Sequence, residues 1–271
     1  MRSLPPMAGW ALVALLAAAG PAERERAGRA SALVSYVAAD YPTAVGPGGE
    51  ILSAEELAEQ GQFLREAAAE LRASAAGDLA GELDALVLRV DDRAAPAEVL
   101  GGAQRVAVRI AQRFDLAMLP REEPDLRRGQ RLYRQACAAC HGGDGTPPPA
   151  ERLALPTRPV AFASRPETAR MSPQRIFAAV TYGVPGTAMP SFGEALGEKE
   201  RWDLAFFALT LSHADRRERT RGEELLRKAP RRPDYLQLAV RSDDQLRAAL
   251  SHANLSPSDR EAILSAVRTG H

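Results

Sequence analysis

The sequence predicts an all-α protein. Through most of the chain, apolar side chains recur every three or four positions, which is the spacing of one helix face. Several of these runs begin at a Ser or Asp that can cap a helix, and no run shows the alternation typical of a half-buried strand. The 271 residues suffice for one large domain or two smaller ones, and with only 5% aromatic residues the core must consist mainly of Leu, Ala and Val.

Residues 1–22 have the pattern of an export signal. Arg2 gives a positive start, residues 10–19 form an apolar run, and small residues separate this run from the charged residues 23–26. So short a run fits a cleaved signal peptide better than a membrane span, with an uncleaved amphiphilic anchor as the alternative. We therefore expect a periplasmic protein of the Gram-negative type that is soluble after signal cleavage.

The charge balance gives no sign of a nucleic acid partner. Lys and Arg together number 35, as do Asp and Glu, so the formal net charge is zero. Chains that bind nucleic acid usually carry a basic excess, and we therefore expect no such partner here.

Residues 23–118 are predicted to form a helical domain. Ser53 and Glu56 have the spacing of a capping box, and apolar residues recur at helical spacing after them. Four such stripes can close a small antiparallel bundle, which would serve as a docking or spacer module. The other three stripes cover residues 32–40, 79–90 and 99–114.

Acidic residues of the second predicted helix could supply hard oxygen ligands for iron. Charge runs of this kind more often form a solvated helix face, and this is the interpretation that we favour. Asp40 and Tyr41 are likewise expected to be structural. The acidic residues are Glu55, Glu56, Glu59, Glu66 and Glu70.

Two prolines mark residues 119–125 as a linker, because Pro120 and Pro124 interrupt helix on either side. A second unit is predicted over residues 126–213. Residues 214–271 are predicted to form a C-terminal helical segment, with helix starts of the capping type within it.

Residues 137–141 read Cys-Ala-Ala-Cys-His and contain the only two cysteines. Cys-x-x-Cys-His is the attachment pattern of haem c, in which two thiols add to the haem vinyl groups and the histidine lies under the iron. A disulfide across so small a loop would stabilise little, a zinc site needs about four ligands, and a thioredoxin-like pair needs a βαβ context. We therefore predict one covalent haem, held by Cys137, Cys140 and His141.

Met189 is the best candidate for the second axial ligand of a low-spin haem. It lies in the Gly- and Pro-rich run of residues 183–193, and such a loop can place a thioether over the ring face. Met/His ligation raises the reduction potential and suits an electron carrier. Met118 and Met171 are expected to fill gaps in the core, and His213 is expected to be a solvated helix end.

On these residues, the segment 126–213 resembles a class I cytochrome c domain. Gly129 and Tyr133 match the family's first helix, where a small and an aromatic residue pack against the last helix. Trp202 and Phe207 match that last helix, and the run Gly-Thr-Ala-Met-Pro-Ser-Phe matches the methionine loop. The resemblance implies an all-α domain, flanked here by an N-terminal helical bundle and C-terminal helices.

The same resemblance implies a proline whose carbonyl accepts a hydrogen bond from the proximal histidine. Pro159 is assigned to this role, with Pro156 as the alternative. It further implies a monohaem electron carrier rather than an enzyme, because a bound thioether would block the iron. A peroxidase-like haem enzyme and a haem-based sensor or interaction module are the alternatives.

The whole mature chain also resembles the periplasmic N-terminal part of bacterial proteins that fuse a cytochrome c to a high-affinity iron permease. The supporting residues are 35–37, 40–42, 44–45 and 238–250. The permease region has no counterpart in the 271 residues, so we expect a separately encoded permease or a truncated or soluble relative. The resemblance suggests a role in uptake of iron or a related metal, with a membrane iron permease as a candidate redox partner.

Overall fold

The computed structural model describes residues 19–155, 157–184, 186–228, 233–251 and 254–270. The predicted export signal thus lies almost entirely outside the described residues. Within them, every regular element is a helix, apart from one isolated antiparallel bridge between Val45 and Ile51. The predicted all-α class is confirmed. None of the described helices combines the length and hydropathy that crossing a membrane requires.

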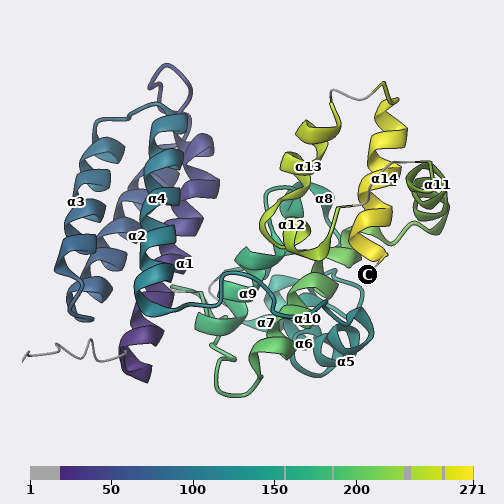
Figure 1. Ribbon diagram of the computed structural model, residues 1–271, viewed down its shortest axis with the longest axis horizontal. Coiled ribbons are helices and arrows are strands. Elements are labelled where there is room, and N and C mark those ends of the chain that lie inside the picture. The colour runs from purple at the N-terminus through teal and green to yellow at the C-terminus, as the bar shows by residue number, and fades with distance from the viewer. Residues whose placement is uncertain (1–18, 156, 185, 229–232, 252–253, 271) are drawn as a thin grey trace, which may run out of the picture.

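The first four helices form an N-terminal bundle, seen at the left of Figure 1. They are α1 (Pro21–Ala44), α2 (Ala54–Arg72), α3 (Gly77–Asp91) and α4 (Pro96–Phe114). Helix α1 is much longer than the predicted stripe over residues 32–40. The sequence expectation followed apolar residues alone, whereas α1 begins in the charged stretch, where the Gly20 amide donates to Glu23 Oε2 at 2.8 Å. Ser53 caps α2 as predicted, since its hydroxyl accepts from the Glu56 amide at 3.2 Å.

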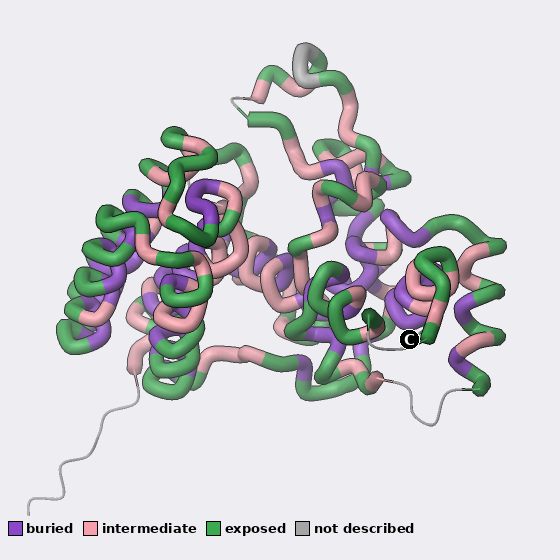
Figure 2. The backbone as a smooth tube through the Cα atoms, turned by 90° about the horizontal axis from the view of Figure 1, so that it is seen from above, coloured by how far each residue is buried: buried purple, intermediate pink, exposed green. Residues whose placement is uncertain are grey.

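The bundle has its own hydrophobic core. Each helix contributes a fully buried aliphatic side chain to it, among them Leu33, Leu64, Leu83 and Ile110. Full burial of such a side chain contributes about 1.5–3 kcal/mol, so this core can hold the four helices together. Figure 2 shows the buried positions on the inner faces of these helices and the exposed positions outside. Helix α1 also packs against α9 of the next unit.

The central helices follow the linker and have a core of their own. They are α5 (Leu126–Ala136), α6 (Ala138–His141), α7 (Ala150–Leu153), α8 (Arg165–Thr168), α9 (Pro173–Tyr182) and α10 (Glu198–Thr210), with the short η1 (Leu211–His213). Helix α5 crosses α10 closely at Gly129, where a Cβ atom would lie 2.2 Å from the Asp203 carbonyl oxygen. The ring centroids of Tyr133 and Phe207 lie 5.5 Å apart at the same crossing. The predicted packing of the first helix on the last is confirmed.

Substituting Gly129 by Ala is expected to destabilise the central helices, because the added methyl group meets backbone that cannot move aside without separating α5 from α10. Overpacking of this kind costs about 1–3 kcal/mol. Gly143→Ala is the control, since a Cβ atom there meets nothing within 4 Å. Urea unfolding of both variants measures the difference, and equal stabilities would contradict the close crossing.

The C-terminal helices pack onto the central helices (Figure 1). They are α11 (Arg216–Leu226), α12 (Tyr235–Val240), α13 (Asp243–Leu250) and α14 (Pro257–Thr269). Leu238, Leu246 and Leu264 belong to the same buried cluster as Trp202 and Leu209 of α10. The C-terminal helices and α10 therefore share one continuous core.

A buried polar cluster ties these helices together at His213. Its Nε2 lies 2.8 Å from Asp243 Oδ2, and its Nδ1 lies 2.9 Å from Ser265 Oγ. Arg268 Nε donates to the other oxygen of Asp243 at 2.8 Å. The prediction of a solvated helix end was wrong, since His213 is fully buried. Sequence reasoning considered His213 only within its own helix, and the residues that cover it come from α13 and α14.

Replacing Asp243 by Asn is expected to lower the unfolding free energy by about 3–5 kcal/mol at pH 7, because it leaves Arg268 buried without its charged partner. Burial alone would raise the pKa of Asp243, but the hydrogen bond from His213 and the charge of Arg268 outweigh it, and the net pKa is lowered. A lowered pKa stabilises the folded state above the unfolded-state pKa of about 3.9, and this stabilisation is lost at lower pH.

The wild type should therefore lose stability below about pH 4, where the difference between it and Asp243→Asn should shrink. Urea unfolding at pH 7 and at acid pH measures both effects. The control is Asp244→Asn, because Asp244 is half-exposed and pairs with Arg247 at the surface. A difference that stays constant with pH would contradict the assignment of this stabilisation to the Asp243 carboxylate.

Candidate functional site

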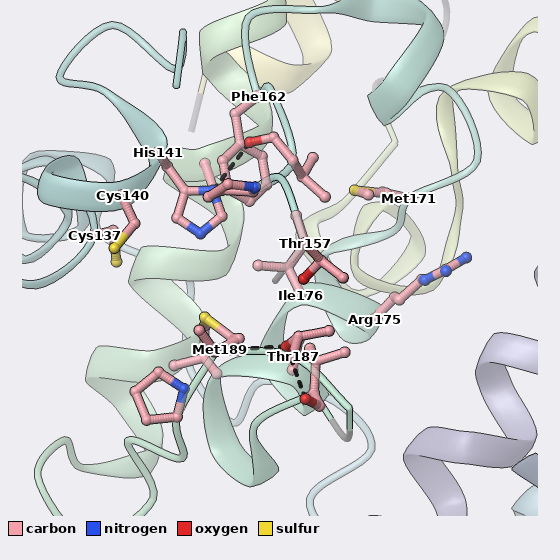
Figure 3. Close-up of a pocket in the computed structure, with 18 of the residues that line it drawn as sticks. Cys137, Cys140, His141, Thr157, Phe162, Met171, Arg175, Ile176, Thr187 and Met189 are labelled. Carbon is pink, nitrogen blue, oxygen red and sulfur yellow. Dashed lines mark hydrogen bonds between the residues drawn. The ribbon is translucent and has the colours of Figure 1, made fainter. Parts of the chain in front are cut away.

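A cavity of about 550 Å³ lies between the N-terminal bundle and the central helices. Its wall is mostly apolar and includes Tyr133, Phe162, Ile176 and Leu204. Figure 3 shows the residues that point into it from α6, from the segment around residue 160, from α9 and from the loop before α10. The cavity is thus bounded on several sides by separate elements, and it is large enough for a sizeable ligand.

The two cysteines and the histidine enter the cavity wall from one helical turn. The amide of His141 donates to the Cys137 carbonyl at 2.9 Å, so the motif forms a turn of helix directly after α5. Cys137 is buried, Cys140 is exposed, and neither is in a disulfide. Burial and the neighbouring Cys140 raise the pKa of the Cys137 thiol to about 11. Both sulfur atoms are therefore free to bond to a group in the cavity.

His141 is held with one nitrogen toward the backbone and the other toward the cavity (Figure 3). Its Nδ1 lies 3.0 Å from the Val160 carbonyl oxygen, and because a carbonyl only accepts, Nδ1 carries the proton. Burial lowers the pKa of His141, and the hydrogen bond to Val160 offsets this only in part. The neutral ring therefore presents the lone pair of Nε2 to the cavity, as a metal ligand requires.

The role assigned to Pro159 falls instead to the next residue. Pro159 lines the cavity, but the carbonyl that meets His141 is that of Val160. The segment is fixed just beyond this point, where the Ala161 amide donates to Glu167 Oε2 at 2.8 Å, so the carbonyl of Val160 faces the ring. The alternative, Pro156, lies outside the described residues.

Met189 enters the cavity from the loop between α9 and α10. The Thr187 hydroxyl accepts from the Met189 amide at 3.1 Å, and the Met189 carbonyl accepts from the Val184 amide at 3.2 Å. Figure 3 shows its sulfur facing the His141 ring across the cavity, with the cysteines at one side. Met171 lines the same cavity and packs against the core, so it is the alternative thioether.

The residues around the cavity fit a haem. Two free thiols, an imidazole and a thioether line one largely apolar space, which is the donor set of a covalently attached haem with two axial ligands. In addition, the hydroxyl of Tyr133 is buried on the wall and has no hydrogen-bond partner among the described residues. A buried polar atom of this kind is typical of a site that a bound group completes.

Sequence reasoning missed the part of the wall that comes from the N-terminal bundle and from α9. Asp40 was taken as structural and Glu59 as part of a solvated face, yet both line the cavity. The only local signal was the spacing of Tyr36 and Asp40, which places them on one face of α1. Within the described residues, no group of three or more His, Cys, Asp or Glu side chains is arranged to hold a metal ion.

Part of the chain matches a known protein family. Residues 124–207 match the family described as "Cytochrome C oxidase, cbb3-type, subunit III". The match contains the Cys-x-x-Cys-His motif and Met189, and it leaves both flanks of the chain uncovered. Neither a search of curated proteins nor a search of solved structures found a match. The chain therefore contains a cytochrome c domain at residues 124–207, with helices on both sides of it.

Proposed function

We propose that this protein is a periplasmic monohaem c-type cytochrome that transfers single electrons. The observation that carries the proposal is the convergence of Cys137, Cys140, His141 and Met189 on one apolar cavity inside the cytochrome c domain. The iron of a haem supplies a one-electron couple, and the chain's residues hold it and exclude water from it. The export pattern of residues 1–22 supports the periplasmic location.

Each of these residues has a distinct part in holding the haem. Cys137 and Cys140 would form the thioether bonds, while His141 Nε2 and Met189 sulfur would be the axial ligands. The Val160 carbonyl fixes the proton on His141 Nδ1 and thereby the orientation of the ring. The hydrogen bonds of Thr187 and Val184 hold the Met189 backbone in place, so the thioether needs little reorganisation between oxidation states.

An electron carrier fits this site better than a haem enzyme does. An enzyme needs an open iron position and a polar distal pocket, whereas the thioether of Met189 faces His141 across the cavity. A sensor would need a group that recognises a signalling ligand or a partner protein. The described residues that line the cavity do not point to such a ligand or partner. The spectrum of the oxidised protein separates the electron carrier from the other two, because Met–iron bonding is expected to give a weak far-red band.

The test is to produce the protein in a periplasm with haem c maturation and to extract it with acidic acetone. We expect the pigment to stay with the polypeptide, and we expect the far-red band in the oxidised form. Pigment that passes into the acetone would contradict covalent attachment. Ready binding of CO by the reduced wild type, without a far-red band, would favour the enzyme or the sensor.

The association with iron uptake is the more specific part of the proposal. It is supported only by the resemblance of residues 35–45 and 238–250 to the fusion proteins, and the family match covers neither segment. A strain that lacks the gene should take up iron more slowly if a permease is the redox partner. Unchanged iron uptake in that strain would contradict the association with iron uptake, but not the proposal that the protein is an electron carrier.

A further inference from the structure

We infer that the N-terminal bundle forms a charged wall of the haem pocket, and that Asp40 of this bundle and Arg175 of α9 shift the reduction potential in opposite directions. The inference rests on the proposed function, since it concerns the haem that the cavity would hold. It gives the bundle a role in the redox chemistry in addition to any role as a spacer. None of the residues involved belongs to the haem-binding motif.

The bundle reaches the cavity through α1 and α2. Tyr36, Asp40, Glu59 and Phe63 line the same cavity as Cys137, Cys140, His141 and Met189. Helix α1 packs directly against α9, which contributes Arg175 and Ile176 to the same cavity. The cytochrome c domain alone therefore leaves this side of the pocket open, and the bundle closes it.

Arg175 connects the two units at the edge of the cavity. Its Nη2 lies 2.6 Å from Asp40 Oδ2, and its Nη1 lies 3.3 Å from Asp40 Oδ1. The guanidinium also lies over the Tyr36 ring, 4.6 Å from its centroid, and its side chain is only 16% exposed. A guanidinium held by a bidentate contact and a ring face keeps its place, so it acts as a fixed positive charge.

The covalent structure of haem directs its carboxylates toward this charge. Its vinyl groups and its two propionates lie on opposite edges of the ring. Figure 3 shows Cys137 and Cys140 on one side of the cavity and Arg175 on the far side, with Thr157 between. A haem joined to the two cysteines would therefore turn its carboxylate edge toward Arg175, and the guanidinium, already paired with Asp40, could bind one of these carboxylates.

Other charged groups face the same region. Arg158 and Glu59 line the cavity, and Arg170 approaches Asp40 at 3.9 Å without lining it. Arg175 is more buried than Arg170, the other arginine near Asp40, and of these two only Arg175 lines the cavity. Its charge is therefore screened least by solvent.

The signs of the expected effects follow from simple electrostatics. Oxidised haem carries one more positive charge than reduced haem, so a nearby positive charge favours the reduced form and raises the potential. Arg175 acts in this direction, and Asp40 acts in the opposite direction. Removing the two charges one at a time should therefore shift the potential in opposite directions. If the two substitutions acted only by loosening the bundle, both would shift the potential in the same direction.

The experiment compares the midpoint potentials of the holoprotein variants Arg175→Gln, Arg175→Lys, Asp40→Asn and Arg170→Gln. We expect Arg175→Gln to lower the potential and Asp40→Asn to raise it, each by a several-fold change in the redox equilibrium, where tenfold corresponds to about 59 mV for one electron. Arg175→Lys keeps the charge and should stay close to the wild type. Arg170→Gln is the matched control, because Arg170 contacts Asp40 but lies outside the cavity wall, and we expect a smaller shift.

Three results would overturn the inference while haem attachment and the far-red band persist. They are shifts of Arg175→Gln and Asp40→Asn in the same direction, no shift in either, or a shift of Arg170→Gln as large as that of Arg175→Gln. In each case the proposed electron carrier would stand. A wild type that carries no covalent haem would instead overturn the proposed function, and this inference with it.

Discussion

Replacing both Cys137 and Cys140 by Ser is expected to yield a protein without covalent haem. Serine hydroxyls do not add to vinyl groups, so no thioether bond can form and the purified protein should be colourless. The central helices should also lose their fold, because the haem would fill a cavity of about 550 Å³ against their core. The N-terminal bundle should persist, because it has a separate hydrophobic core.

Two measurements separate these effects. The pyridine haemochrome spectrum reports the covalent haem, and circular dichroism reports the helix that remains. A residual helical signal with no haemochrome is the expected result, corresponding to a folded bundle beside unfolded central helices. The single variant Cys140→Ser is the control, because it keeps the buried thiol of Cys137 and should retain a weaker attachment. Covalent haem in the double variant would refute the assignment of the motif.

Replacing Met189 by Ala is expected to keep the covalent haem and to open the iron. The thioether opposite His141 is lost, so the far-red band should disappear and the reduced protein should bind CO. The potential should fall by an amount on the order of 0.1 V, well within the range of about 0.8 V that axial ligands span. Spectroelectrochemistry and CO titration measure the two effects.

Met171→Ala is the matched control for this variant. Met171 lines the same cavity and packs against the same core, so its loss removes a similar volume from a similar place. We expect it to keep the far-red band and to bind no CO. The reverse pattern, with the band lost in Met171→Ala and kept in Met189→Ala, would exchange the roles of the two methionines.

Local patterns in the sequence were sufficient for most of the helices and for four residues that line the cavity, Cys137, Cys140, His141 and Met189. The crossing of α5 and α10 was predictable because it needs a small residue and an aromatic residue at fixed spacing, and Gly129 and Tyr133 satisfy both requirements. The placement of Met189 was predictable because a Gly- and Pro-rich loop cannot continue a helix. Each of these features depends on chemistry within a short stretch of chain.

Features that depend on distant parts of the chain were not predictable in this way. His213 is covered by α13 and α14, whose packing no local pattern reveals. Asp40 meets Arg175 although 135 positions separate them in the chain. The exchange of Val160 for Pro159 is a smaller error of a different kind, because the choice of carbonyl depends on how the segment is anchored at Glu167. Spacing rules contain no information on such long-range contacts.

Because α10 and the C-terminal helices share one core, the segment that matches the family, residues 124–207, is shorter than the segment that is expected to fold as a unit. A protein cut after residue 207 would bare the side of α10 that faces α14 and the side of α9 that faces α12, and it would lack His213 altogether. The smallest piece expected to fold without this exposed apolar surface and to take up haem therefore extends through α14. The helices beyond residue 207 thus keep an apolar surface of the central helices out of water.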